Sequence, residues 1–146
     1  MNEDYHGGCQ CGRIRYALSG ALPPAYACHC GECKKQSASA FSLSVAVASD
    51  RLKMAGISAS FETVAYSGAT KTCYFCPKCG TRLWHGSSAS PDIVTLKVGT
   101  LDNSANIAPH AHLWVSKKQA GISLDPGVPA FDTQPENLAR WREGLK

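Results

Sequence analysis

The chain has 146 residues, with 44% hydrophobic and 18% charged side chains and a formal net charge of +4. This composition excludes a disordered or fibrous protein, and the length fits a single domain over residues 1–146. No apolar run approaches the ~18 to 20 residues that cross a bilayer, and residues 1–6 lack the basic and apolar parts of a signal peptide. We therefore expect a cytoplasmic protein without a membrane partner.

Short segments that alternate polar and apolar residues, separated by Gly, Pro, Ser and Asn, predict a mainly β fold. The expected strands span residues 13–18, 41–47, 61–66, 72–75, 82–85, 93–98 and 112–115. In the second of them, the apolar residues at odd positions from Phe41 to Val47 are expected to face the core. Because a parallel crossover needs a dozen or more residues, such closely spaced strands favour antiparallel pairing.

Two short helical segments are expected. Residues 32–39 are polar and free of β-branched side chains, which favours one or two helical turns. Residues 133–136 match a capping box, and the helix that follows would pack on the sheet through Leu138, Trp141 and Leu145. We interpret residues 120–135 as a loop that could act as a mobile flap.

The eight cysteines fall into three clusters: Cys9 and Cys11; Cys28, Cys30 and Cys33; and Cys73, Cys76 and Cys79. Cysteines this close in sequence bridge poorly, because a disulfide needs Cα atoms about 4.4 to 6.8 Å apart with converging side chains. A tight turn readily supplies thiolates to one zinc ion, and a reducing cytosol keeps thiols free for metals. A glycine follows three of the cysteines and can take the positive φ that lets such a turn curl. The clusters therefore predict zinc.

Cys76 and Cys79 supply two of the four ligands that a tetrahedral zinc site needs. Cys9 and Cys11 are the obvious second pair, and they precede Cys76 by more than sixty residues. We expect these four thiolates to form a structural zinc site that ties the start of the chain to its middle.

Cys28, Cys30 and Cys33 are left with three thiolates and a vacant fourth position, the arrangement typical of catalytic zinc. Cys73 keeps an alternative open, because either it or an unseen partner could close this second site as an inert centre. The interpretation we favour for Cys73 is a buried free thiol that packs as a small hydrophobe.

Metal binding would also change the charge. Seven bound thiolates and two Zn²⁺ ions lower the formal charge from +4 to about +1. The longest basic runs are Lys34-Lys35 and Lys117-Lys118. A nucleic-acid partner is therefore disfavoured.

Several motifs resemble those of a known family. They are Gly8-Cys9-Gln10-Cys11-Gly12, Cys28-His29-Cys30-x-x-Cys33, Phe75-Cys76-Pro77-Lys78-Cys79-Gly80-Thr81 and His112-Leu113-Trp114. In this order they are similar to the glutathione-dependent formaldehyde-activating enzyme family, which includes centromere protein V, and the resemblance covers residues 5–131. It implies a mainly β, zinc-braced fold of the kind also seen in a small Rab-associated exchange factor and in methionine sulfoxide reductase B.

Carried over residue by residue, the resemblance implies the same division of ligands as the spacing. The structural zinc ligands would be Cys9, Cys11, Cys76 and Cys79, and the catalytic zinc ligands Cys28, Cys30 and Cys33. The implied activity is that of a carbon–sulfur lyase, which adds glutathione to formaldehyde and forms S-hydroxymethylglutathione. The glutathione sulfur would take the vacant zinc position, where a coordinated thiol loses its proton.

The carboxylates of glutathione need cations, and Lys34 and Lys35 follow the second cluster directly. Their alternative role is a solvated helix face. His29 could shuttle protons, although a side chain between two ligands more often points away, and His110 and His112 would share one face of a strand. The expected partners are thus a small thiol and a small carbonyl, with two zinc ions as cofactors. The alternative function is a non-enzymatic zinc-stabilised interaction or nucleic-acid-binding module like centromere protein V.

Overall fold

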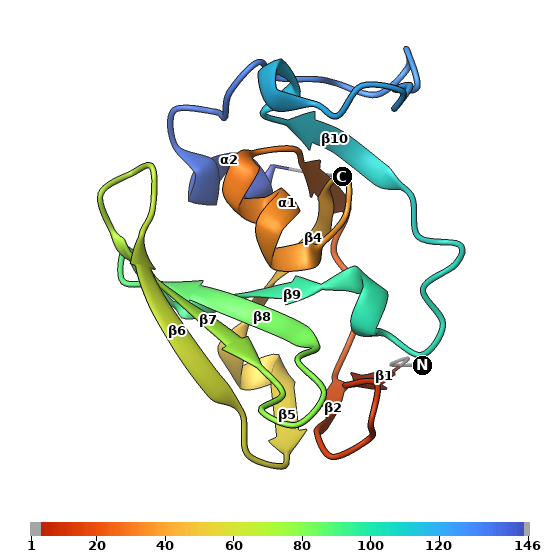
Figure 1. The fold of residues 1–146 in the computed structure, drawn as a ribbon, viewed down its shortest axis with the longest axis vertical. Helices are drawn as coiled ribbons and strands as arrows, with labels where there is room; N and C mark the ends of the chain where they lie inside the picture. Colours follow the sequence, from red (N-terminus) through yellow and green to blue (C-terminus); the bar gives the residue numbers. More distant parts are fainter. Residues whose placement is uncertain (1–3, 145–146) are drawn as a thin grey trace.

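The computed structural model describes residues 4–144, which form a mainly β fold with ten strands and two short helices (Figure 1). The strands are β1 (Tyr5–Gly8), β2 (Arg15–Leu18), β3 (Ala25–Cys28), β4 (Ser42–Ala48), β5 (Leu52–Ala55), β6 (Ala59–Val64), β7 (Thr70–Phe75), β8 (Arg82–Ser87), β9 (Ser90–Lys97) and β10 (Pro109–Leu113). The helices are α1 (Gly31–Ser37) and α2 (Leu138–Glu143). The seven expected strands are all present with ends shifted by a few residues, whereas β1, β3 and β5 were not expected.

The strands form two sheets. The larger has seven strands in the order β10-β3-β4-β9-β8-β7-β6, and the smaller has three in the order β1-β2-β5. In Figure 1 the small sheet lies at the lower end of the molecule and β10 at the upper end. The expected antiparallel pairing is wrong for one pair, because β10 runs parallel to β3. Strand spacing constrains only consecutive strands, and the long connection from β3 to β10 leaves ample chain for a parallel crossover.

One face of the seven-stranded sheet packs into the main core. Leu18 of β2 and Ile14, which precedes that strand, are fully buried there. Val45 and Val47 of β4 and Leu96 of β9 are also fully buried, and these three side chains lie on one face of the sheet because successive residues of a strand point to opposite sides. The expectation for β4 is therefore confirmed at its two valines.

The other face of the same sheet is polar. The cross-strand register places Ser44 of β4 beside both Tyr26 of β3 and Lys97 of β9, and places Thr95 of β9 beside His85 of β8. Ser44 and Thr95 are buried although they are polar. The alternation in these strands therefore separates an apolar core from a second, polar enclosed region.

The second helix differs from the sequence expectation. It begins after Asn137, whose side-chain oxygen accepts the backbone N–H of Arg140 at 3.0 Å, so the expected cap at Thr133 is wrong. The reason is Pro135, because the residue before a proline is disfavoured in the helical region. Leu138 and Trp141 pack on a small second core, as expected, and Leu145 lies outside the described residues.

The segment between β10 and α2 is irregular but bonded to the sheet. His112 N–H donates to the Pro129 carbonyl and Trp114 N–H donates to the Thr133 carbonyl, at 2.9 and 2.7 Å. Phe131 N–H in turn donates to the His112 carbonyl at 2.8 Å. These bonds hold the segment that precedes α2 against β10. In the described part of the chain, neither helix has the length and hydrophobicity that crossing a membrane requires.

We expect Leu96→Ala to lower the free energy of unfolding by about 2 to 5 kcal/mol, because it leaves a cavity in the main core. Ile57→Ala is the control, since that side chain is 86% exposed and its loss should change stability by less than about 0.5 kcal/mol. Urea denaturation followed by circular dichroism measures both. Equal effects of the two substitutions would contradict the position of the core.

Candidate functional site

The first cysteine group joins two distant turns. The sulfurs of Cys9, Cys11, Cys76 and Cys79 all lie within 4.8 Å of one another. Cys9 and Cys11 sulfurs are 3.5 Å apart, and Cys11 and Cys76 sulfurs are 3.7 Å apart. Zn–S bonds of about 2.3 Å in a tetrahedron put neighbouring sulfurs roughly 3.8 Å apart. The spacing of these sulfurs therefore fits a four-thiolate metal site.

The turns around this group donate hydrogen bonds to the sulfurs. Ile14 N–H donates to Cys9 Sγ at 3.3 Å, and the Thr81 hydroxyl lies 3.2 Å from Cys79 Sγ. Hydrogen bonds from the hydroxyl and the backbone N–H of Thr81 lower the pKa of Cys79 to about 5. Gly12 and Gly80 have a φ of 79°, as the expected curled turns require. Gly31, which follows Cys30, instead begins α1.

The second cysteine group lies where β3 meets α1. Cys28 ends β3, Cys30 is the N-cap of α1, and Cys33 lies in the first turn of that helix. Their sulfurs lie within 4.8 Å of one another, and Cys33 N–H donates to Cys30 Sγ at 3.3 Å.

The three sulfurs share protons unequally. Hydrogen bonds from the thiols of Cys28 and Cys30 hold the pKa of Cys33 far below its usual range, and the same sharing raises the pKa of Cys28. A metal cation would replace these shared protons, since cysteine binds metals as the thiolate. The donor set therefore suits a thiophilic ion such as zinc.

Cys73 stands apart from both groups. It is 1% exposed in β7, where it pairs with Phe61 of β6 and His85 of β8. Among the described residues, no fourth cysteine, histidine, aspartate or glutamate joins Cys28, Cys30 and Cys33 in one cluster.

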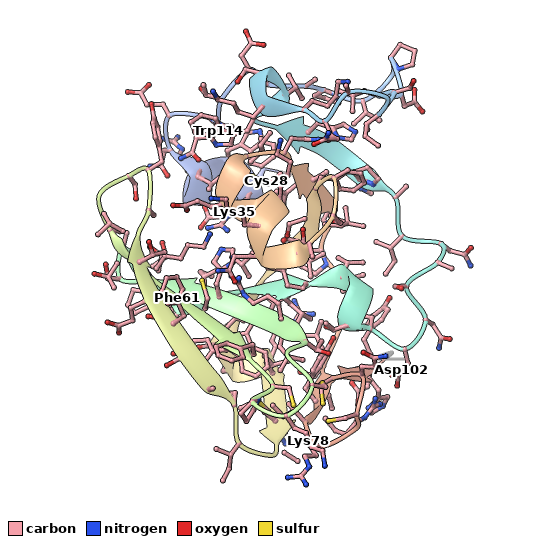
Figure 2. All side chains as sticks on the ribbon, in the orientation of Figure 1. Cys28, Lys35, Phe61, Lys78, Asp102 and Trp114 are labelled. Atoms are coloured by element: carbon pink, nitrogen blue, oxygen red, sulfur yellow. The ribbon has the colours of Figure 1, made fainter. Side chains whose placement is uncertain are left out.

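The second group opens onto a cavity of about 850 Å³, and all three of its cysteines line this space. Its walls come from the polar face of the large sheet, from both helices and from the segment after β10. The rings of Tyr66 and Trp114 meet edge to face at 5.0 Å on the cavity wall. Figure 2 shows Cys28 and Trp114 in the upper part of the molecule, far from Lys78, which adjoins the first group at the lower end.

Cations line the inner wall of the cavity. Lys97 donates from Nζ to the hydroxyls of Ser42 and Ser44, at 3.1 and 3.0 Å. Burial lowers the pKa of Lys97 to about 8, although the nearby Cys33 thiolate opposes this shift. Lys71 lines the same wall. Neither lysine is predicted from the sequence as a cavity residue, because a lysine in an alternating strand suggests a solvent-exposed face.

His85 also lines the cavity and was not expected there. Burial and the positive charges of Lys97 and Lys71 hold the pKa of His85 well below its usual range, so the ring is neutral at physiological pH. Arg82 Nη2 lies 3.4 Å from Nδ1 of His85 and can only donate, which makes Nδ1 the acceptor and leaves the ring proton on Nε2. His85 is therefore a neutral hydrogen-bond donor.

Lys34 and Lys35 lie on α1 but do not line this cavity. Lys34 Nζ donates to the Lys117 carbonyl at 2.8 Å, and Lys35, labelled in Figure 2, is exposed. Their expected contact with the carboxylates of glutathione stays a prediction.

His29 packs away from the cavity. It is fully buried, its Nε2 lies 2.9 Å from Nδ1 of His112, and its ring contacts that of Phe41 at 5.1 Å. His110 is exposed whereas His112 is 5% exposed, and the β10 register shifts between Pro109 and His112.

Comparison with known proteins finds a similar solved structure and a matching family. Among solved structures, a protein of Rhodobacter sphaeroides is 15% identical over 86% of this chain and 98% of its own, with a TM-score of 0.55. This likeness concerns the fold alone, and no curated protein matches. The family model for glutathione-dependent formaldehyde-activating enzyme matches residues 4–117, which include all eight cysteines but not α2. The chain belongs to the glutathione-dependent formaldehyde-activating enzyme family.

Proposed function

We propose that this chain is a zinc-dependent carbon–sulfur lyase that adds a glutathione-like thiol to formaldehyde or a related small carbonyl. The observation that carries this proposal is the three-sulfur group, which opens onto a cavity of about 850 Å³. Such a volume suits a small organic substrate. Family membership supports the choice of thiol and carbonyl.

Two zinc ions fit the two groups of sulfurs. Cys9, Cys11, Cys76 and Cys79 would hold a structural ion that braces one domain over residues 1–146, in the manner of the exchange factor and reductase folds named above. When bound at the second group, zinc supplies a centre that keeps a substrate thiol in its thiolate form. Free thiols of this kind require a reducing compartment such as the cytoplasm.

The chain's own cations would balance the charge of this centre. Cys28, Cys30 and Cys33 as thiolates outweigh one Zn²⁺ by one negative charge, and a substrate thiolate adds another. Lys97 and Lys71 lie close enough to lower the pKa of Cys33. Their ammonium groups would therefore offset the electrostatic repulsion among four thiolates in a partly enclosed cavity.

His85 is suited to the carbonyl. As the substrate sulfur attacks the carbonyl carbon, a C–S bond forms and the π electron pair of the C=O bond moves to oxygen, which takes a proton from water in place of the one that the substrate thiol released. A neutral imidazole with its proton on Nε2 can donate a hydrogen bond to that oxygen as charge develops. His85 lines the same cavity as the three cysteines, so one small substrate could contact both.

A second function has one observation in its favour. The bond from Lys34 Nζ to the Lys117 carbonyl brings the pairs Lys34-Lys35 and Lys117-Lys118 together on the surface. Four neighbouring lysines could bind a polyanion such as nucleic acid, as in a non-enzymatic interaction module. We favour the enzyme, because this patch does not use the second cysteine group.

The zinc-loaded protein should accelerate the exchange of ¹³C-formaldehyde with S-hydroxymethylglutathione, measured by NMR exchange spectroscopy. Cys30→Ser should reduce the exchange to the uncatalysed rate, because it removes one of three thiolates. Cys73→Ser is the matched control and should retain the acceleration, since Cys73 lies outside both groups. Wild-type protein that leaves the uncatalysed rate unchanged would overturn the proposal.

The two groups should differ in their effect on folding. Cys76→Ser should unfold the domain, because structural zinc contributes on the order of 10 kcal/mol in small zinc peptides. Cys30→Ser should keep the fold, since its group joins neighbouring residues of β3 and α1. Far-UV circular dichroism and zinc content measure both variants. Equal loss of structure would show that the division into structural and catalytic sites is wrong.

Under the enzyme proposal, the lysine patch should bind duplex DNA only weakly, with a Kd of roughly 10⁻⁴ to 10⁻⁶ M at physiological salt. Lys34→Gln with Lys35→Gln should then change a gel-shift titration no more than Lys53→Gln with Lys78→Gln, which removes two exposed lysines elsewhere. Tight, salt-dependent binding that only the first pair of substitutions weakens would favour the interaction module.

A further inference from the structure

An arginine from the C-terminal helix reaches the cavity wall. Arg142 of α2 donates from Nη1 to the Tyr26 hydroxyl at 3.0 Å and to the Thr95 hydroxyl at 3.1 Å. Tyr26 lies on β3 and Thr95 on β9, so one guanidinium joins α2 to two strands of the sheet. All three residues line the same cavity as the second cysteine group. The side chain is therefore held in place before any ligand arrives.

No acidic group of the described residues forms an ion pair with Arg142. Within residues 4–144, the one ion pair joins Arg15 to Asp102. The acidic residues of the cavity wall, Glu32 and Glu136, are both exposed. Arg142 Nε is buried and has no hydrogen-bond acceptor. A buried donor without an acceptor is destabilising, and an anionic ligand that accepted its hydrogen bond would offset that cost.

The unused edge of the guanidinium suits a carboxylate. Nη1 is occupied by Tyr26 and Thr95, and the bonds of the described residues leave Nε and Nη2 without an acceptor. These two nitrogens form one planar edge, and two parallel N–H groups match the two oxygens of a carboxylate. A point-like cation such as lysine would not select this planar group.

The position of Arg142 matches a ligand that also reaches the cysteines. Tyr26 precedes Cys28 by two residues on β3, and Thr95 precedes Lys97 by two residues on β9. Residues two apart lie on the same face of a strand, roughly 7 Å from each other. A thiol and a carboxylate in one small molecule can span such a step.

We propose that Arg142, positioned by Tyr26 and Thr95, binds a carboxylate of the thiol substrate and thereby selects anionic thiols. This inference rests on the proposed function for the identity of the ligand. It adds a specificity-determining residue from a helix that lies outside the residues matched by the family model.

The alternative role of Arg142 is purely structural. Its guanidinium lies 5.9 Å from the centre of the Tyr26 ring, and α2 packs on the second core through Leu138 and Trp141. A structural arginine would stabilise α2 but would not distinguish a carboxylate from its ester. The probe must therefore vary the charge of the ligand as well as the protein.

Isothermal titration calorimetry of the zinc-loaded protein tests the proposal. The probes are S-methylglutathione, which has carboxylates but no free thiol, and its diethyl ester, which has lost both carboxylate charges. We expect the ester to bind at least about 10-fold more weakly, in line with charge-assisted hydrogen bonds. Arg142→Gln should weaken binding of the acid by about 10- to 100-fold and leave binding of the ester unchanged.

Arg140→Gln is the matched control, because it removes the same charge from an exposed position on the same helix. It should bind the acid as the wild type does. Arg142→Lys keeps the charge but loses the planar edge, so its affinity should lie between those of wild type and Arg142→Gln. Thermal unfolding by circular dichroism measures the stability of each variant.

Equal affinity of wild type for acid and ester, or absence of binding of either, would overturn the inference. So would equal losses in Arg142→Gln and Arg140→Gln. Because S-methylglutathione has no thiol to present to zinc, this binding does not depend on the lyase activity. Arginine-dependent binding without acceleration of formaldehyde exchange would thus overturn the proposed function and retain the anion subsite.

Discussion

The alternation of successive side chains in the central strands determines which residues pack in the core and which line the cavity. In β4 and β9 it places Val45, Val47 and Leu96 in the core, and it places Ser44 and Lys97 on the cavity wall. Because the period is fixed, a shift of one residue in register would exchange the two faces. The core that stabilises the sheet therefore also positions the polar groups of the cavity.

The two cysteine groups relate differently to this sheet. The first connects residues far apart in sequence, from the turn before β2 to the turn between β7 and β8, so a metal there would close a long loop. The second uses neighbouring residues at the junction of β3 and α1, where the fold is already set by strand pairing. Under the proposed function, metal bound by the same type of thiolate ligand would brace the fold at the first group and would be free to bind a substrate at the second.

The sequence predicted the cysteine groups better than their surroundings. Cysteines in short turns can be identified as candidate metal ligands from their local spacing. The structure brings their sulfurs together in the two sets that the sequence predicts. Lys97 and His85 could not be found in this way, because an alternating strand does not show whether its polar face meets solvent or an enclosed cavity. The parallel pairing of β10 with β3 depends on contacts between distant parts of the chain, which local patterns do not show. The helix α2 starts later than the capping pattern predicts, because the residue before Pro135 is disfavoured in the helical region.

The cysteines and the arginine of the cavity come from different parts of the chain. The matched residues 4–117 contain every cysteine of both groups, together with Lys71, His85 and Lys97. The part after residue 117 adds Arg142, and hydrogen bonds hold the segment around Phe131, which leads to its helix, against β10. A change in that part could alter which ligand enters the cavity without moving a sulfur. Under the proposals above, the residue that would select the substrate lies on α2, whereas the cysteines that would hold the reacting thiol lie on β3 and α1.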